Sequence, residues 1–201
     1  TSTPRGRVVL PPKLPPMRLS EAISLPTYQS LLTSGFANGW ANFGARVSVL
    51  PLFAASVFAN GSAAAGLALT AFALGTAVTL QFSGRLADAV GRKPLIIAGL
   101  AATTVFTGSL GLATHVWSLL LLSVLAGVGG GLMNPAQQAT LADLIGNERS
   151  GGKALSTFQM TMDAGQICAP IVVGMLAEVY GFGVAFASCG ALTLASLIVW
   201  L

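Results

Sequence analysis

Apolar residues form long runs along this chain, and the few charged residues gather in short stretches between them. Residues 47–84 and 94–142 contain no Asp, Glu, Lys or Arg. Runs of this length match membrane-spanning helices, which need about 20 apolar residues each. Neither run alternates between apolar and polar residues as the strands of a membrane β-barrel do. The pattern therefore predicts helices, whose backbone groups bond within the segment and need no partner in lipid.

Turn residues and charges divide the apolar runs into six predicted spans. Asn60-Gly61-Ser62 predicts a turn within the first run, and a short polar stretch around His115 divides the second. The expected fold class is an all-α membrane protein with six transmembrane helices. The spans are expected at about 31–58, 63–83, 95–113, 117–139, 156–177 and 183–201.

Composition supports a membrane protein. Only 8% of the residues are charged, 54% are hydrophobic and the mean hydropathy is +0.78, whereas soluble domains are about 25% charged. Residues 1–29 are rich in Pro and basic residues and are predicted to be a cytosolic linker, followed by a six-helix bundle over 30–201. Because the chain begins without Met and ends as the last span becomes long enough to cross, we expect it to be part of a longer polypeptide.

The positions of the basic residues predict topology rather than nucleic-acid binding. The net charge is +4, and nine of the ten Lys and Arg residues precede the first span or lie in loops on the same side of the membrane. The positive-inside rule makes that side cytoplasmic. With six spans both termini are then cytoplasmic, and we expect the plasma membrane as the location and the lipid bilayer as a partner. The nine residues are Arg5, Arg7, Lys13, Arg18, Arg85, Arg92, Lys93, Arg149 and Lys153.

The loop between the second and third spans, "GRLADAVGRKP" at 84–94, is the densest cluster of charge. Asp88 and Arg92 are four residues apart and can pair if the turn is helical. Gly91 supplies a tight turn, and Pro94 suits the first turn of the next helix. We interpret the loop as a charged cytosolic clasp, with an anchoring loop that only obeys the positive-inside rule as the alternative. The gating candidates are Gly84, Asp88, Gly91, Arg92 and Lys93.

This loop resembles the G-x-L-A-D-R-x-G-R-K-P motif of the major facilitator superfamily, which lies between the second and third or the eighth and ninth helices. Ala89 departs from the motif where the family usually has Arg. The resemblance implies a secondary transporter built of two six-helix halves. It also implies that Asp88 and Arg92 latch this half against a helix of the other half in one transport state.

A second stretch repeats the motif ninety residues downstream. "GMLAEVYGF" at 174–182 matches "GRLADAVGR" at 84–92 in its glycines and apolar residues, and Gly75 and Gly165 fall at the same offset. The two copies end the second and fifth spans, which run in opposite directions. We therefore expect a 3+3 inverted repeat, as in one half of a facilitator fold.

Two further stretches indicate which half of the facilitator fold this chain resembles and whether its transport is driven by protons. The fourth helix of the family's first half often carries L-x-R-x-x-Q-G, but this chain has Ser123 and Ala126 at the Arg and Gln positions. That favours helices seven to twelve, so that the functional unit needs a missing N-terminal half or a second copy. "DAGQICAPIVVG" at 163–174 resembles in part an element of proton-driven drug antiporters, which Gly165, Pro170 and Gly174 match as a helix-packing motif.

A polar stripe lies inside the first span. Asn38, Asn42 and Arg46 recur every four residues and share one face of a helix. A charge at this depth costs about 2.5–3.5 kcal/mol and needs compensation. We interpret the stripe as one wall of a substrate cavity, with Asn134 and Gln138 of the fourth span as further candidates. The alternative is an Arg46 that reaches outward past the apolar side chains or bonds backbone carbonyls.

Asp163 is the one acidic residue inside a predicted span. A carboxylate in a medium of low dielectric exchanges protons nearer to neutral pH. Asp163 is therefore a candidate for proton coupling, and the alternative role is a structural or gating ion pair.

The expected function is secondary transport of a small solute, as proton-coupled export of a drug or metabolite. Proton-coupled uptake of a polar or anionic solute is an alternative within transport, and a non-transporting scaffold, a receptor-like relative or a truncated product is the alternative class. The single histidine, His115, lacks a nearby Cys, Asp or Glu, so the sequence predicts no metal site, no cofactor and no enzyme.

Overall fold

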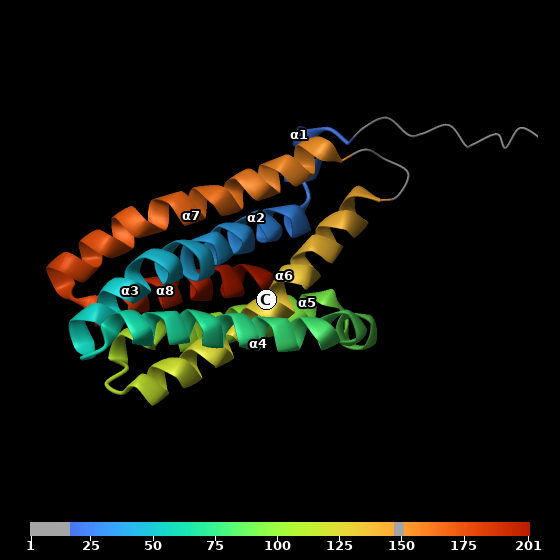
Figure 1. Ribbon diagram of the computed structural model, residues 1–201. Helices are drawn as coiled ribbons and strands as arrows, with labels where there is room; N and C mark the ends of the chain where they lie inside the picture. Colours follow the sequence, from blue (N-terminus) through green and yellow to red (C-terminus); the bar gives the residue numbers. More distant parts are fainter. Residues whose placement is uncertain (1–16, 147–150) are drawn as a thin grey trace, which may run out of the picture.

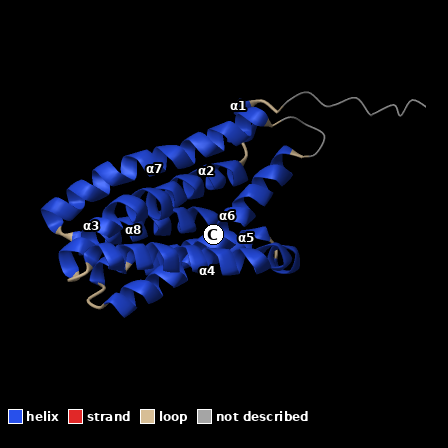
Figure 2. Ribbon diagram, in the orientation of Figure 1, coloured by secondary structure: helices blue, strands red, loops and turns tan. Residues whose placement is uncertain are grey.

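The computed structural model describes residues 17–146 and 151–201, and every regular element in these ranges is a helix (Figures 1 and 2). Most of the predicted basic linker, with Arg5, Arg7 and Lys13, lies outside the described residues, as does Arg149. The elements are α1 (Leu19–Ile23), α2 (Pro26–Asn38), the π-helix η1 (Gly39–Ala45), α3 (Arg46–Val57), α4 (Gly61–Val90), α5 (Arg92–Ala102), the π-helix η2 (Thr103–Thr107), the 3-10 helix η3 (Leu110–Leu112), α6 (Val116–Ile145), α7 (Gly152–Tyr180) and α8 (Phe182–Trp200).

Five helical segments of the described part are long and apolar enough to cross a membrane. The predicted first span is divided into α2, η1 and α3, which follow one another without a break over residues 26–57. The all-helical class is thus confirmed, whereas the count of six spans stays a prediction. The five segments are Gly61–Val90, Arg92–Leu112, Val116–Ile145, Gly152–Tyr180 and Phe182–Trp200.

The predicted linker is helical in the part that the structure describes. Residues Leu19–Ile23 form α1, and α2 begins at Pro26, which occupies the first turn of that helix, where its missing N–H costs nothing. Met17 and Ala22 are buried in an apolar cluster that also contains Tyr28 and Leu31 of α2. The hydroxyl of Tyr28 donates a hydrogen bond of 2.8 Å to the carbonyl of Ala154, which joins α2 to the start of α7.

The apolar side chains pack in two main clusters, one toward each end of the bundle. One cluster lies near the turns that join α3 to α4 and α7 to α8, where Phe53 packs edge-on against Phe58, Phe182 and Phe186. The other lies at the opposite end and includes Tyr28 and other large side chains of α2, α5, α6 and α7.

Glycines bring helices into backbone contact. A methyl group on Gly127 of α6 would overlap the carbonyl oxygen of Phe72 in α4, and one on Gly75 would overlap that of Val124. The hydroxyl of Thr76 also donates a 3.0 Å hydrogen bond to the Gly127 carbonyl. Small residues at such crossings allow the close packing that drives helix association in lipid.

The contact between α7 and the first helical segment has the same basis. Gly165 of α7 lies against the carbonyl of Phe36 and the backbone N–H of Trp40, and Gly39 lies against the carbonyl of Met162. By contrast, a methyl group on Gly174 would meet no described atom within 4 Å. Of the two glycines in the predicted helix-packing motif, only Gly165 therefore packs tightly within the described helices.

We expect Gly165→Ala to destabilise the protein because its methyl group would meet backbone, which cannot move aside as a flexible side chain can. The overlap should lower the free energy of unfolding by about 1–3 kcal/mol. Thermal unfolding of the purified protein in detergent measures the effect, with Gly174→Ala in the same helix as the control. Equal unfolding temperatures for the two variants would contradict this account of the packing.

Candidate functional site

An asparagine network, formed by Asn38, Asn42 and Asn134, joins the first helical segment to α6. The Nδ2 group of Asn42 donates to Oδ1 of Asn38 at 3.0 Å, and Nδ2 of Asn38 donates to Oδ1 of Asn134 at 2.5 Å. Asn38 and Asn42 are buried. Buried amides are costly unless they bond one another, so these three residues hold two helices in a fixed register.

The other predicted polar residue of α6 lies apart from this network. Gln138 is exposed, whereas its neighbour Gln137 is 1% exposed and its amide nitrogen has no hydrogen-bond partner among the described residues. Sequence reasoning missed Gln137, because adjacent residues on a helix point in directions about 100° apart and a spacing of four from Asn134 favoured Gln138.

Arg46 is fully enclosed by the bundle. Its side chain is 1% exposed, its Nη2 group donates a 2.8 Å hydrogen bond to the Thr107 hydroxyl of η2, and its guanidinium carbon lies 4.2 Å above the ring centre of Phe72 in α4. A cation over an aromatic face is attracted by the electrons of the ring. Arg46 therefore does not reach the bundle surface, and its Nη2 group bonds a hydroxyl rather than a backbone carbonyl.

The π-helix η1 lies directly before Arg46 and contains Asn42. Such segments are rare and occur often at functional sites. The wider turn changes the angle between successive side chains, so Arg46 faces Thr107 and Phe72 rather than continuing the contact of Asn38 with α6. The four-residue spacing thus predicted a polar stripe, but its members divide between two neighbouring parts of the interior.

The charged loop after α4 pairs differently from the prediction. Arg92 forms an ion pair with Asp143 of α6 and donates a 2.8 Å hydrogen bond to the Ala139 carbonyl. The expected partner, Asp88, is exposed and forms no ion pair among the described residues. A pair four residues apart requires a continuous helix, and α4 ends at Val90.

The end of α4 depends on Gly91. Gly91 has φ 96° and ψ 164°, a conformation that is open to glycine and costly for other residues. Its backbone N–H bonds to the Ala87 carbonyl at 3.0 Å. The same conformation ends α7 at Gly181, with φ 86° and ψ 165° and a 3.0 Å bond to Ala177.

Asp163 lies on an exposed face of α7. Its Oδ1 accepts a 3.0 Å hydrogen bond from the amide of Gln159, one turn earlier on the same helix. It forms no ion pair within the described ranges. Pro170, seven residues further along, lies inside α7, which continues to Tyr180. Apart from the bond to Gln159 on its own helix, no hydrogen bond or ion pair to another described helix fixes the environment of Asp163.

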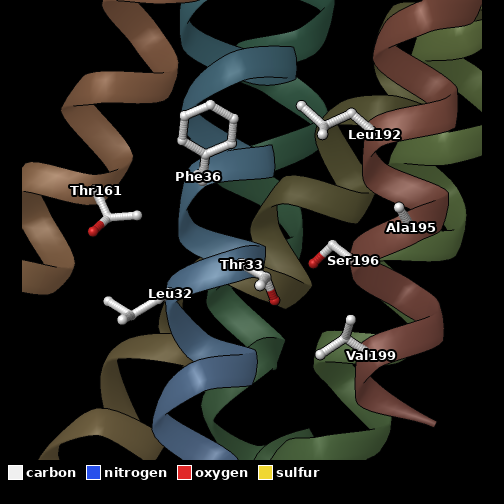
Figure 3. Close-up of a pocket in the computed structure, with 8 residues that line it drawn as sticks. All are labelled: Leu32, Thr33, Phe36, Thr161, Leu192, Ala195, Ser196 and Val199. Atoms are coloured by element: carbon white, nitrogen blue, oxygen red, sulfur yellow. The ribbon is translucent and has the colours of Figure 1, made fainter. Parts of the chain in front are cut away.

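A largely apolar pocket of about 340 Å³ lies between α2, α7 and α8 (Figure 3). Thr33 of α2 and Ser196 of α8 are among its lining residues, and the buried Ser196 hydroxyl has no hydrogen-bond partner among the described residues. None of the predicted site residues lines this pocket. Its residues come from three helices that are far apart in sequence, so only the helix crossings bring them together.

A bundle of apolar helices with a polar interior and a charged loop at one end is typical of membrane transporters. The family model of the Major Facilitator Superfamily matches residues 31–201. The chain therefore belongs to this superfamily and is part of a multi-pass membrane protein, as the loop at 84–94 predicted.

Similar proteins include bacterial proteins named for drug resistance. The chain is 34% identical to "Multi-drug resistance efflux pump PmrA" of Streptococcus pneumoniae over 126 residues, which is 63% of this chain and 31% of the relative. It is 32% identical to "Multidrug resistance protein 2" of Bacillus subtilis over 155 residues, 77% of this chain and 37% of the relative. The matched part thus spans about a third of the length of these relatives.

Two solved transporter structures share the fold. The POT family transporter PepTSo superposes with a TM-score of 0.77 at 20% identity, over 87% of this chain and 36% of that structure. A peptide transporter POT mutant in complex with alafosfalin superposes with a TM-score of 0.74 at 21% identity, over 89% of this chain and 40% of that structure.

We expect Arg92→Ala to lower stability by about 1 kcal/mol, because it removes a partly exposed ion pair and the hydrogen bond to Ala139 together. Asp143→Asn should cost less, because Arg92 keeps its bond to the carbonyl. Lys93→Ala is the control, since Lys93 is exposed and forms no ion pair within the described ranges. Chemical or thermal unfolding in detergent measures the three, and a Lys93→Ala effect as large as that of Arg92→Ala would refute the pairing.

Proposed function

We propose that this chain is the C-terminal six-helix half of a transporter that moves a small solute across the plasma membrane by alternating access. The observation that carries the proposal is the buried polar interior of a facilitator bundle, in which Arg46 and the asparagine network lie among apolar helices. Polar and charged groups at such depth are expensive and mark solute or ion pathways. No cofactor enters the proposal.

Six spans in a 3+3 inverted repeat are part of this proposal. Gly91 and Gly181, ninety residues apart, end α4 and α7 with nearly the same backbone angles. Gly75 and Gly165 have the same offset, and they pack α4 against α6 and α7 against α2. In such a repeat the second span corresponds to the fifth and the fourth to the first, so these two contacts are equivalent by symmetry.

The missing partner is a second six-helix unit that covers α4 and α7. Only 17% of the most apolar stretch of α7 and 28% of that of α4 are buried, against 44% for α6. The relatives are about three times as long as the matched part, which favours an N-terminal half of the same polypeptide over a second copy.

The loop 84–94 gates the transporter in this proposal. Arg92 is held by Asp143 in the present conformation, whereas Asp88 is exposed at the end of α4 and is available to a helix of the other half. Gly84 is also exposed and has open space around its Cα, which permits close approach of such a helix. Contacts made in one state and lost in the other bias which side is open.

Both termini are proposed to be cytoplasmic. The helix ends that carry Arg18, Arg85, Arg92 and Lys153 gather at the same end of the bundle (Figure 1). The positive-inside rule places this end in the cytosol.

Proton-coupled export of drugs or metabolites is the proposed direction, because relatives at 32–34% identity are named for multidrug resistance. Asp163 is the proposed proton carrier, since it lies on the face of α7 that the second half would cover and so desolvate. Arg46 favours a second candidate, the uptake of an anionic solute, because a buried cation attracts negative charge.

The test is proton flux in liposomes that contain the complete polypeptide and an internal pH-sensitive dye. We expect addition of a cationic drug or a small organic anion to cause proton flux that Asp163→Asn abolishes in folded protein. Glu178→Gln is the matched control, because Glu178 is an exposed carboxylate near the other end of α7.

The outcomes separate the hypotheses. Flux that survives Asp163→Asn would leave a transporter and assign Asp163 to a structural or gating ion pair. Flux with anions alone would favour the uptake candidate. Absence of flux with every solute, in protein shown to be folded, would favour a scaffold, a receptor-like relative or a truncated product.

A further inference from the structure

Arg46 is a buried cation without a counter-charge. Among the described residues Arg46 forms no ion pair, and its Nε and Nη1 groups have no hydrogen-bond partner. The contacts with Thr107 and Phe72 involve a hydroxyl and an aromatic ring, both of which are uncharged. Two of the three nitrogens of the guanidinium thus have no hydrogen-bond partner among the described residues, and no negative charge there neutralises it, although buried ions require both.

The missing half of the transporter does not supply this counter-charge in the present conformation. The side chain of Arg46 is 1% exposed although this chain stands alone. The helices that enclose it are α4, η2 and α8 of the same chain, through Phe72, Thr107 and Cys189. A group on another six-helix unit would have to enter this bundle to reach the guanidinium.

Further unused hydrogen-bonding capacity lies around Arg46. The indole N–H of Trp40 is buried, and its neighbour among the described residues is the Cys189 thiol, which also lies near the guanidinium. That thiol donates to the Ala185 carbonyl at 3.6 Å and is itself a weak acceptor. Oδ1 of Asn42, one helical turn before Arg46, is also unpaired. The Nε and Nη1 groups of Arg46 bond none of these acceptors.

We propose that Arg46 and Trp40 bind the anionic group of a small solute, a carboxylate or a comparable monovalent anion, inside this half. One positive charge requires one negative charge, and the unpaired N–H groups are donors for which a carboxylate supplies acceptors. A water molecule would satisfy the donors but would leave the charge unbalanced. The inference rests on the proposed transport function and adds to it the chemical class of the solute.

The π-helix η1 supplies a local means of access. It includes Trp40 and Asn42 and ends directly before Arg46. An α-helix has fewer residues per turn than the π-helix present here. A change of η1 from π-helix to α-helix would therefore move the Trp40 indole and the Asn42 amide relative to the guanidinium. A local change in one helix would therefore alter the surroundings of Arg46 without separating the whole bundle.

The experiment measures thermal unfolding of the complete polypeptide in detergent at neutral pH and constant ionic strength. The probes are sodium benzoate, sodium acetate and sodium chloride, with benzamide as an uncharged molecule of nearly the same shape as benzoate. We expect benzoate or acetate to raise the unfolding temperature in a saturable way, and benzamide to leave it unchanged, because a ligand that binds only the folded state stabilises it.

Arg46→Gln should weaken the apparent affinity for the carboxylate on the order of thirtyfold or more, because it removes one partner of a buried charge pair. Arg18→Gln is the matched control, since Arg18 is exposed directly before α1 and lies outside the loop 84–94, and it should keep the full response. If Arg46→Gln does not fold, Trp40→Phe takes its place. It keeps the charge and removes one donor, and it should weaken binding by roughly fivefold to tenfold.

Each result decides the question. A response to chloride as large as that to carboxylates, lost in Arg46→Gln, would support the anion site and identify a free inorganic anion as the ligand. Equal responses in the wild type and in Arg46→Gln, or the absence of a response to any anion, would overturn the inference. Proton flux with a cationic drug in that same protein would then leave the proposed transport function standing.

Discussion

Backbone contact at glycine is the constraint on which the rest of this bundle depends. Lipid tails are as apolar as the helix surfaces, so close packing, rather than burial from water, holds transmembrane helices together. Gly127 of α6 meets the backbone of Phe72, and Gly165 of α7 meets the backbone of Trp40. Phe72 also provides the ring beneath Arg46, and the indole of Trp40 lies beside Cys189, which is a neighbour of the guanidinium. The two glycine contacts therefore determine the surroundings of the buried charge.

The buried polar residues also fix how the packed helices are aligned along their axes. Asn38 lies between Asn42 and Asn134 and bonds both, so α2 and α6 cannot slide without leaving buried amides unpaired. Apolar contacts tolerate small displacements, whereas a hydrogen bond weakens steeply with distance and angle. The bundle thus combines glycine contacts, which set how close the helices lie, with amide contacts, which set their alignment.

The sequence predicted the all-helical class and the family because long charge-free runs and one dense loop motif are local features. From the spacing of four it also predicted the cavity candidates Asn38, Asn42, Arg46, Asn134 and Gln138. The three asparagines bond one another, whereas Arg46 and Gln138 lie apart from that network. The sequence did not predict that Arg92 pairs with Asp143, because the partners lie on different helices and Gly91 ends the helix that the expected pair needed. The π-helix and the pocket of Figure 3 were missed for a related reason, since both depend on how helices cross.

Three charged side chains of this chain fall into two groups, which differ in what surrounds the charge. The helices of this chain alone shield Arg46 from solvent. The free-energy cost of burying its charge therefore does not depend on what packs against the surface of the bundle. Asp88 and Asp163 are exposed on α4 and α7, the spanning helices with the least burial, so their energies depend on what packs against those faces. If the two halves rock against each other, the environments of the two aspartates change while that of Arg46 is preserved. In the proposed transport cycle, coupling is therefore assigned to the two aspartates, and recognition of a bound group is assigned to the arginine.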